Sequence, residues 1–144
     1  MHHRFAVWVS GLWGGLLLGV GFVGAPAGFA VAAAEIAGRS AARMFAVEAY
    51  VSLAAALTLL ILTRKFAGVQ PGQAVVPAFN TNVLLVLGTL FCTIVSGFVI
   101  QPMMAPARAG QGSLSFGALH GLSAGFFALK ALLVLALAWR LTAS

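Results

Sequence analysis

Four long apolar stretches dominate the chain and leave few ways for it to fold. They cover residues 5–24, 43–63, 81–100 and 116–139, and each is close to the roughly 20 apolar residues that a helix needs to cross a bilayer. Continuous runs of this length favour helices over membrane-barrel strands, which are about 10 residues long and alternate in polarity. The sequence therefore predicts an all-α protein, an integral membrane four-helix bundle forming a single transmembrane domain over residues 1–144.

The composition excludes two other classes of protein. Hydrophobic residues make up 62% of the chain and charged residues 7%, far below the charged quarter that is typical of soluble domains. The eight Lys and Arg residues are scattered along the chain, so no nucleic-acid-binding patch is predicted. The expected partners are the lipid bilayer and either further copies of the chain or a larger membrane assembly.

Charges between the apolar stretches predict an orientation. Four crossings place both chain ends on one side of the membrane, and the basic residues divide four to three between that side and the other: Arg4, Arg64, Lys65 and Arg140 against Arg39, Arg43 and Arg108. The positive-inside rule then predicts a bacterial inner-membrane protein with both termini in the cytoplasm.

The first apolar stretch and the segment after it carry two further expectations. Ala25-Pro26-Ala27 imitates a signal-peptide cleavage site, but the apolar run is longer than a usual signal core, so we expect the segment to be retained. Residues 26–42 are rich in alanine and predict an interfacial helix on the non-cytoplasmic surface. All five prolines fall outside the four apolar stretches.

Two of the predicted helices carry glycine at every fourth position. These glycines are Gly11, Gly15 and Gly19 in the first helix and Gly117, Gly121 and Gly125 in the fourth. Small residues let membrane helices approach closely, so the first and fourth helices are expected to pack together through these faces. The alternative is that one stripe mediates a homodimer.

Polar residues recur on the sides of three predicted helices and predict a polar interior. They are Glu48 and Ser52 on the second helix, Asn82, Thr89, Thr93 and Ser96 on the third, and His120, Ser123 and Lys130 on the fourth. The hydroxyls have a simpler interpretation, because Ser and Thr in helices often bond to the carbonyl four residues back.

Glu48 and Lys130 need a stronger explanation than the hydroxyls. An ionisable group within the hydrocarbon costs at least about 2.5 kcal/mol, so it is expected to be paired or functional. Glu48 and His120 each lie about one turn inside the non-cytoplasmic end of their predicted helices, which predicts a Glu48–His120 pair. Lys130, near the middle of its helix, is expected to couple more weakly or to face an oligomer partner.

The sequence predicts no catalytic residues, and therefore no enzyme. No serine has a histidine and a carboxylate plausibly at its depth, and Cys92 lies mid-span among apolar residues, where packing is its expected role. No cofactor is expected in this interpretation. The alternative is a haem-binding or copper-handling redox protein in which His120 acts as a ligand together with Met103 or Met104.

Several short motifs are spread over nearly the whole chain. They are Gly24-Ala-Pro-Ala-Gly-Phe29, Ala37-Gly-Arg39, Phe45, Asn82, Gln101-Pro102 and Phe116-Gly-Ala-Leu-His-Gly-Leu-Ser123. Together they resemble an uncharacterised bacterial four-span family related to eukaryotic transmembrane protein 205. The segment Leu119-His120-Gly121-Leu122-Ser123 is the most specific of them.

The resemblance implies a four-helix membrane protein without an established reaction, loosely linked in eukaryotes to platinum-drug resistance and secretory membranes. A more remote similarity, in helix count and span length, is to the copper-resistance D superfamily, some of whose members bind haem. We therefore expect a non-enzymatic inner-membrane protein. It is either a small-molecule or metal-stress membrane component or an assembly subunit, with a charged interior that serves as a binding or relay site.

Overall fold

The computed structural model describes residues 2–66 and 80–143, and the elements within those ranges are all helical. Two of them, η1 and η2, are π-helical. In chain order the elements are α1 (His2–Leu18), η1 (Gly19–Gly24), α2 (Ala25–Val31), α3 (Ala34–Phe66), α4 (Thr81–Thr93), η2 (Ile94–Ile100), α5 (Gln101–Arg108) and α6 (Phe116–Thr142).

These elements form four rods within the part of the chain that the structure describes. Each rod is long and apolar enough to cross a membrane: His2–Val31, Ala34–Arg64, Thr81–Arg108 and Phe116–Thr142. This confirms the predicted all-α four-helix bundle and indicates a multi-pass membrane protein. The four predicted stretches lie inside these rods, which extend beyond them.

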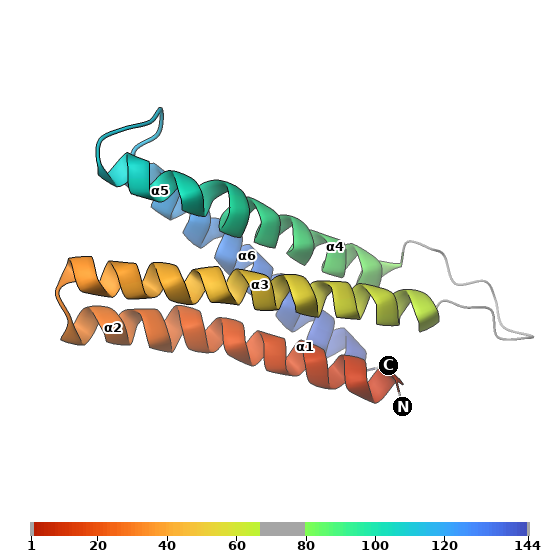
Figure 1. Ribbon diagram of the computed structural model, residues 1–144. Helices are drawn as coiled ribbons and strands as arrows, with labels where there is room; N and C mark the ends of the chain where they lie inside the picture. The colour runs from red at the N-terminus through yellow and green to blue at the C-terminus, as the bar shows by residue number, and fades with distance from the viewer. Residues whose placement is uncertain (1, 67–79, 144) are drawn as a thin grey trace, which may run out of the picture.

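The rods are arranged as two antiparallel hairpins that join into a ring. The first and second rods lie side by side, and both chain termini lie at one end of the bundle (Figure 1). The α2–α3 turn and the α5–α6 loop lie at the other end. Since α3 packs on α1 and α4, and α6 also packs on α1 and α4, each rod has two neighbours.

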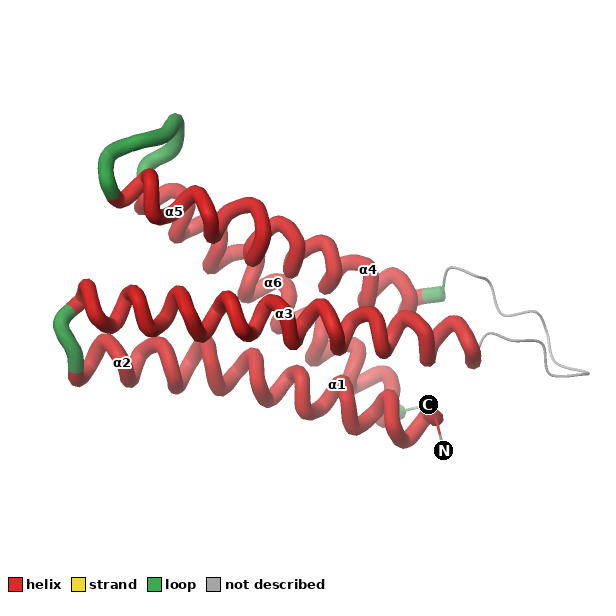
Figure 2. Tube along the Cα trace, in the orientation of Figure 1, coloured by secondary structure: helices red, strands yellow, loops and turns green. Residues whose placement is uncertain are grey.

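A π-helical segment lets the first rod continue past a proline. Proline has no amide hydrogen, and its ring clashes with the carbonyl four residues back. Directly before Pro26, the amide of Ala25 donates to the carbonyl of Val20, five residues back. This wider turn relieves the constraint, and α1, η1 and α2 form one uninterrupted rod (Figure 2).

The third rod uses the same device, with η2 immediately before Gln101 and Pro102. Three prolines that lie outside the predicted apolar stretches therefore lie within the longer helical rods: Pro26, Pro102 and Pro106. The predicted interfacial helix over residues 26–42 is wrong, because the chain turns at residues 32–33 and α3 begins at Ala34.

The apolar core lies in the half of the bundle nearest the termini. Its largest cluster draws on all four rods and includes Trp13, Leu17, Ala56, Leu59, Val86, Val134 and Leu137. In contrast, η1, α2 and α5 contain no buried residue. This cluster therefore extends from the terminal end to about the middle of the bundle, and the buried residues Ala37 and Leu119 lie apart from it near the other end.

The predicted glycine stripes are not what joins α1 to α6. All six glycines are exposed, and a Cβ added at any of them would meet no atom within 4 Å: Gly11, Gly15, Gly19, Gly117, Gly121 and Gly125. The two helices do pack together, but through another face of α1. At Gly14 an added Cβ would lie 3.3 Å from Leu135 and 3.7 Å from Val134, so this buried glycine supplies the close approach.

Candidate functional site

Glu48 and Lys130 lie at the same depth in the bundle. Helices α3 and α6 both begin at the end away from the termini (Figure 1). Each of the two residues lies 14 positions after the first residue of its helix, Ala34 or Phe116. At 1.5 Å per residue this is about 21 Å along the axis, near the middle of a membrane-spanning helix. The predicted depth of Glu48, one turn inside, is wrong because α3 begins nine residues earlier than expected.

The two side chains form a buried ion pair. The ammonium nitrogen Nζ of Lys130 lies 2.8 Å from Oε1 and 2.9 Å from Oε2 of Glu48, and it donates to both oxygens. The side chains are only 2% and 3% exposed. Since each charge would be costly here without the other, the pair accounts for both ionisable residues in the interior.

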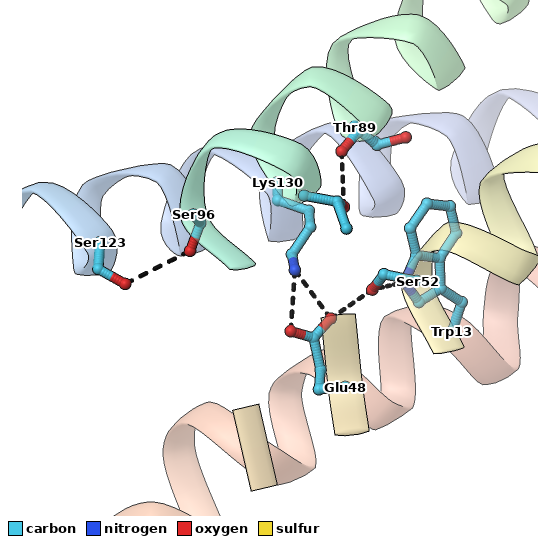
Figure 3. A network of polar contacts seen from close by, with 8 residues as sticks. Trp13, Glu48, Ser52, Thr89, Ser96, Ser123 and Lys130 are labelled. Atoms are coloured by element: carbon cyan, nitrogen blue, oxygen red, sulfur yellow. Dashed lines mark hydrogen bonds and ion pairs between the residues drawn. The ribbon is translucent and has the colours of Figure 1, made fainter. Parts of the chain in front are cut away.

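Two further side chains complete the site. The hydroxyl of Ser52, one turn after Glu48 on α3, donates to Oε1 of Glu48. The indole Nε1 of Trp13 on α1 in turn donates to the Ser52 hydroxyl at 2.8 Å. Figure 3 shows this continuous chain, which we call the central polar network: Trp13, Ser52, Glu48 and Lys130.

The network ties three of the four rods together and leaves its members satisfied. Throughout the described residues, no buried side-chain nitrogen or oxygen lacks a hydrogen-bond partner. The ammonium also lies 5.3 Å from the ring centroid of Phe127, within the range of a cation–π contact. The site is thus preorganised, with one negative and one positive charge that cancel.

Sequence reasoning did not include Trp13. Its signal is the position of a tryptophan in the middle of an apolar stretch, away from the membrane interfaces that tryptophan prefers. A buried indole N–H needs an acceptor. In this fold that acceptor is Ser52, which the sequence did place in the polar interior.

The threonines of the predicted polar interior serve their own helix. Thr89 and Thr93 are fully buried, and their hydroxyls donate to the carbonyls of Val86 at 2.7 Å and of Thr89 at 2.8 Å. These bonds to backbone three or four residues back are the simpler interpretation given to the hydroxyls. The threonines face protein without joining the central polar network.

The remaining predicted polar residues form two separate contacts. The hydroxyls of Ser96 and Ser123 lie 3.3 Å apart and link η2 to α6 (Figure 3). Near the terminal end, the amide oxygen of Asn82 accepts a hydrogen bond of 3.0 Å from Nε of Arg140. The structure therefore divides the predicted polar interior into several contacts at different depths.

The predicted Glu48–His120 pair is wrong. His120 is exposed, and its ring stacks on that of Phe116 one turn earlier, with centroids 5.9 Å apart. The prediction failed because the true start of α3 moves Glu48 to mid-bundle, at the depth of Lys130. The lysine that was expected to couple weakly is the direct partner.

The two candidate soft ligands lie on α5, where Met103 is exposed and Met104 is half-buried. Within residues 2–66 and 80–143, no three His, Cys, Asp or Glu side chains come together in a group suited to a metal ion. Cys92 is buried. A haem or copper site on His120 with Met103 or Met104 stays a prediction.

An apolar cavity borders the ion pair. It has a volume of 280 Å³ and lies between α3 and the first rod. Its lining consists of Leu16, Val20, Arg43, Met44, Val47, Glu48 and Val51. Among the described residues, Oε2 of Glu48 accepts one hydrogen bond, from Lys130. A carboxylate oxygen has capacity for a second donor.

Comparison with protein families gives a match over most of the chain. Residues 8–113 match the model of a family described as a domain of unknown function, DUF4149. The matched region is well over half of the chain and includes Trp13, Glu48 and Ser52. No curated protein and no solved structure matches the chain.

Proposed function

The chain belongs to the DUF4149 family, and we propose that it is a non-enzymatic membrane protein that binds a small amphipathic molecule beside the Glu48–Lys130 ion pair. The observation that carries the proposal is the double role of Glu48. Its carboxylate is held by Lys130, and the residue is also among those that line the 280 Å³ cavity. The proposed location is the bacterial inner membrane, with both termini in the cytoplasm.

The chemistry of the cavity defines the class of ligand. Apolar side chains such as Leu16, Val20 and Val47 make most of its wall and favour a hydrocarbon body. Glu48 offers a hydrogen-bond acceptor, and Lys130 already balances its charge. A neutral molecule with one hydroxyl or amide donor therefore fits best, because a permanent cation would have to compete with Lys130 for the carboxylate.

This function corresponds to the small-molecule membrane component expected from the sequence. Apolar molecules reach such a site by partitioning into the bilayer, so the protein needs no aqueous pathway. The alternative redox function, with His120 and Met103 or Met104 as ligands, stays a prediction, and His120 lies on the surface.

Photolabelling tests the proposal directly. The probe is a medium-chain alkanol carrying a diazirine, applied to the protein in lipid nanodiscs, and the labelled residues are identified by mass spectrometry. We expect saturable labelling around Val47 and Val51 that excess 1-decanol suppresses. The methyl ether of the same probe lacks the hydroxyl donor and should label these positions at least threefold less.

Two matched substitutions show whether the cavity itself is responsible. Val51→Trp fills the cavity and should abolish the saturable labelling. Val99→Trp adds the same ring to an exposed position of η2 and should leave the labelling unchanged. Equal labelling by alcohol and ether, or unchanged labelling of the Val51→Trp protein, would show that the probe reports only general partitioning into lipid.

A further inference from the structure

A second and larger cavity lies between α1 and α6, near the chain ends. Its volume is 610 Å³, and its lining includes Trp8, Gly11, Leu12, Leu135, Ala138 and Trp139. Trp8 and Trp139 are 68% and 77% exposed, and exposed tryptophans near the ends of membrane helices are typical of the bilayer interface. The cavity is therefore an apolar groove that begins at the interface and extends into the hydrocarbon region.

The interfacial end of the groove carries a positive charge. Arg4 lies one helical turn before Trp8, so the two share a side of α1, and Arg4 is exposed. Arg140, next to Trp139 on α6, lies on the α4 side of its helix, because its Nε donates to Asn82 of α4 at 3.0 Å.

No carboxylate side chain balances these arginines. The whole chain has only two acidic residues, Glu35 and Glu48. Glu35 lies in the first turn of α3, at the other end of the bundle, and Glu48 is neutralised by Lys130. The groove thus combines an apolar wall with a positive charge at its interfacial end that no carboxylate side chain balances.

We propose that this groove binds one anionic phospholipid, with an acyl chain between α1 and α6 and the phosphate group at Arg4. A molecule with a long apolar tail and an anionic head matches both parts of the surface. A second copy of the chain matches only one part, because a symmetric dimer of equally oriented chains would bring the two copies of Arg4 together, and like charges repel.

Small residues on α1 leave space in the groove for the acyl chain. Gly11 lines the groove, and a Cβ added there would meet no atom within 4 Å. Gly11 therefore does not contribute to the packing of α1 on α6, but its lack of a side chain keeps the groove open for the acyl chain. The site is independent of the proposed function, since the cavity at Glu48 lies between α1 and α3.

Quenching of tryptophan fluorescence by brominated lipids tests the proposal. The chain has three tryptophans, and the Trp13→Phe variant leaves only Trp8 and Trp139, which both line the groove, as emitters. In nanodiscs with a low fraction of brominated lipid, brominated phosphatidylglycerol should quench at least twofold more than brominated phosphatidylcholine. Unbrominated phosphatidylglycerol should displace it and restore the emission.

Substitutions in this Trp13→Phe background separate a site from a general attraction. Arg4→Gln should remove the preference for the anionic lipid, whereas Arg39→Gln, at the other end, should keep it. Gly11→Leu fills the groove and should reduce quenching by both lipids. Gly15→Leu, on the same helix but outside the groove, should leave quenching unchanged.

Three results would overturn the proposal. Equal quenching by the two lipids would indicate ordinary contact with surrounding lipid. A preference that survives loss of Arg4, or that disappears with Arg39, would mean that the head group is not held at this end. A dimer that Gly11→Leu dissociates, without any lipid preference, would assign the groove to a second copy of the chain.

Discussion

The central polar network shows how one hydroxyl can organise a charged interior. Ser52 donates to Glu48 and accepts from Trp13, so it uses its donor and an acceptor site at once. Lys130 then satisfies both carboxylate oxygens. An ion pair in such surroundings adds little net stability compared with apolar residues, but removal of one partner leaves an uncompensated buried charge.

The ion pair predicts a characteristic pattern of unfolding free energies. Lys130→Met and Glu48→Gln should each lower the free energy of unfolding by about 3 kcal/mol, the usual cost of breaking a buried pair. The double variant should cost less than the two losses combined, by more than about 1 kcal/mol, because neither charge is then left alone. Reversible unfolding in mixed micelles provides the measurement.

His120 provides the control for this cycle. It lies on the surface, so Glu48→Gln and His120→Gln should have additive effects to within about 0.5 kcal/mol. Strong coupling to His120, or additivity of the Glu48 and Lys130 variants, would contradict the pairing seen in the structure.

The indole of Trp13 should contribute through its N–H group. Trp13→Phe keeps an aromatic ring but removes the donor to Ser52, and we expect a loss of at least about 1 kcal/mol in the free energy of unfolding. Trp8→Phe makes the same change at an exposed position and should be nearly neutral. Equal effects of the two substitutions would mean that the hydrogen bond has no measurable role.

At the level of the helices, glycine matters where another backbone comes close. A Cβ added at Gly97 in η2 would lie 2.6 Å from Cβ of Ala49 on α3. Gly121 on α6 has open space around it. Glycines in one bundle therefore differ in role: Gly97 allows a close helix contact, whereas Gly121 does not, and the packing of the helices shows this difference.

This difference gives a prediction for two identical substitutions. Gly97→Ala should destabilise the bundle by about 1–3 kcal/mol through overpacking. Gly121→Ala should be neutral or slightly stabilising, because alanine is the better helix former. Thermal unfolding in detergent distinguishes them, and a lower melting temperature for Gly121→Ala than for Gly97→Ala would refute the orientation of α6.

The orientation of α6 also changes the result expected for leucine substitutions on that helix. The stripes predict that Gly121→Leu impairs the bundle more than Ala128→Leu. Both positions are exposed in the structure, so the two variants should have similar melting temperatures.

The apolar runs were sufficient to predict four helices, but not which side of each helix faces protein. Lipid tails and a protein core are equally apolar, so hydrophobicity does not distinguish the Gly11 side of α1 from the Trp13 side. The helix ends were also not predicted, because a proline such as Pro26 ends a helix unless the turn before it widens into a π-helical turn. Glu48 was assigned to the polar interior, but its partner depended on that unpredicted start of α3.

The molecule as a whole is a ring of four rods with both termini at one end (Figure 1). Each pair of consecutive rods is antiparallel, so Arg4 and Arg140 share their end with Arg64 of α3. The opposite end carries Arg39, Arg43 and Arg108 together with Glu35, whose charge reduces the basic excess there. The charge distribution thus agrees with the proposed orientation.

Reporter fusions test this orientation. A cytoplasm-specific fluorescent reporter fused to the C-terminus should be active, and a periplasm-specific phosphatase at the same position should be inactive, because the more basic end is retained inside. The same pair of reporters inserted between α5 and α6 should give the reverse result. Phosphatase activity at the C-terminus would invert the orientation while leaving the four rods intact.

The distance along the chain between the two charges sets an order of events during synthesis. Glu48 and Lys130 are 82 positions apart, so a nascent chain completes α3 well before α6 has been translated. Until then the carboxylate has Ser52 but no cation, and the inserted helix bears the cost of the unpaired charge. Arrival of the last helix closes the ring and supplies the cation in a single step. A chain that stops before Lys130 therefore leaves this charge unmatched in the membrane.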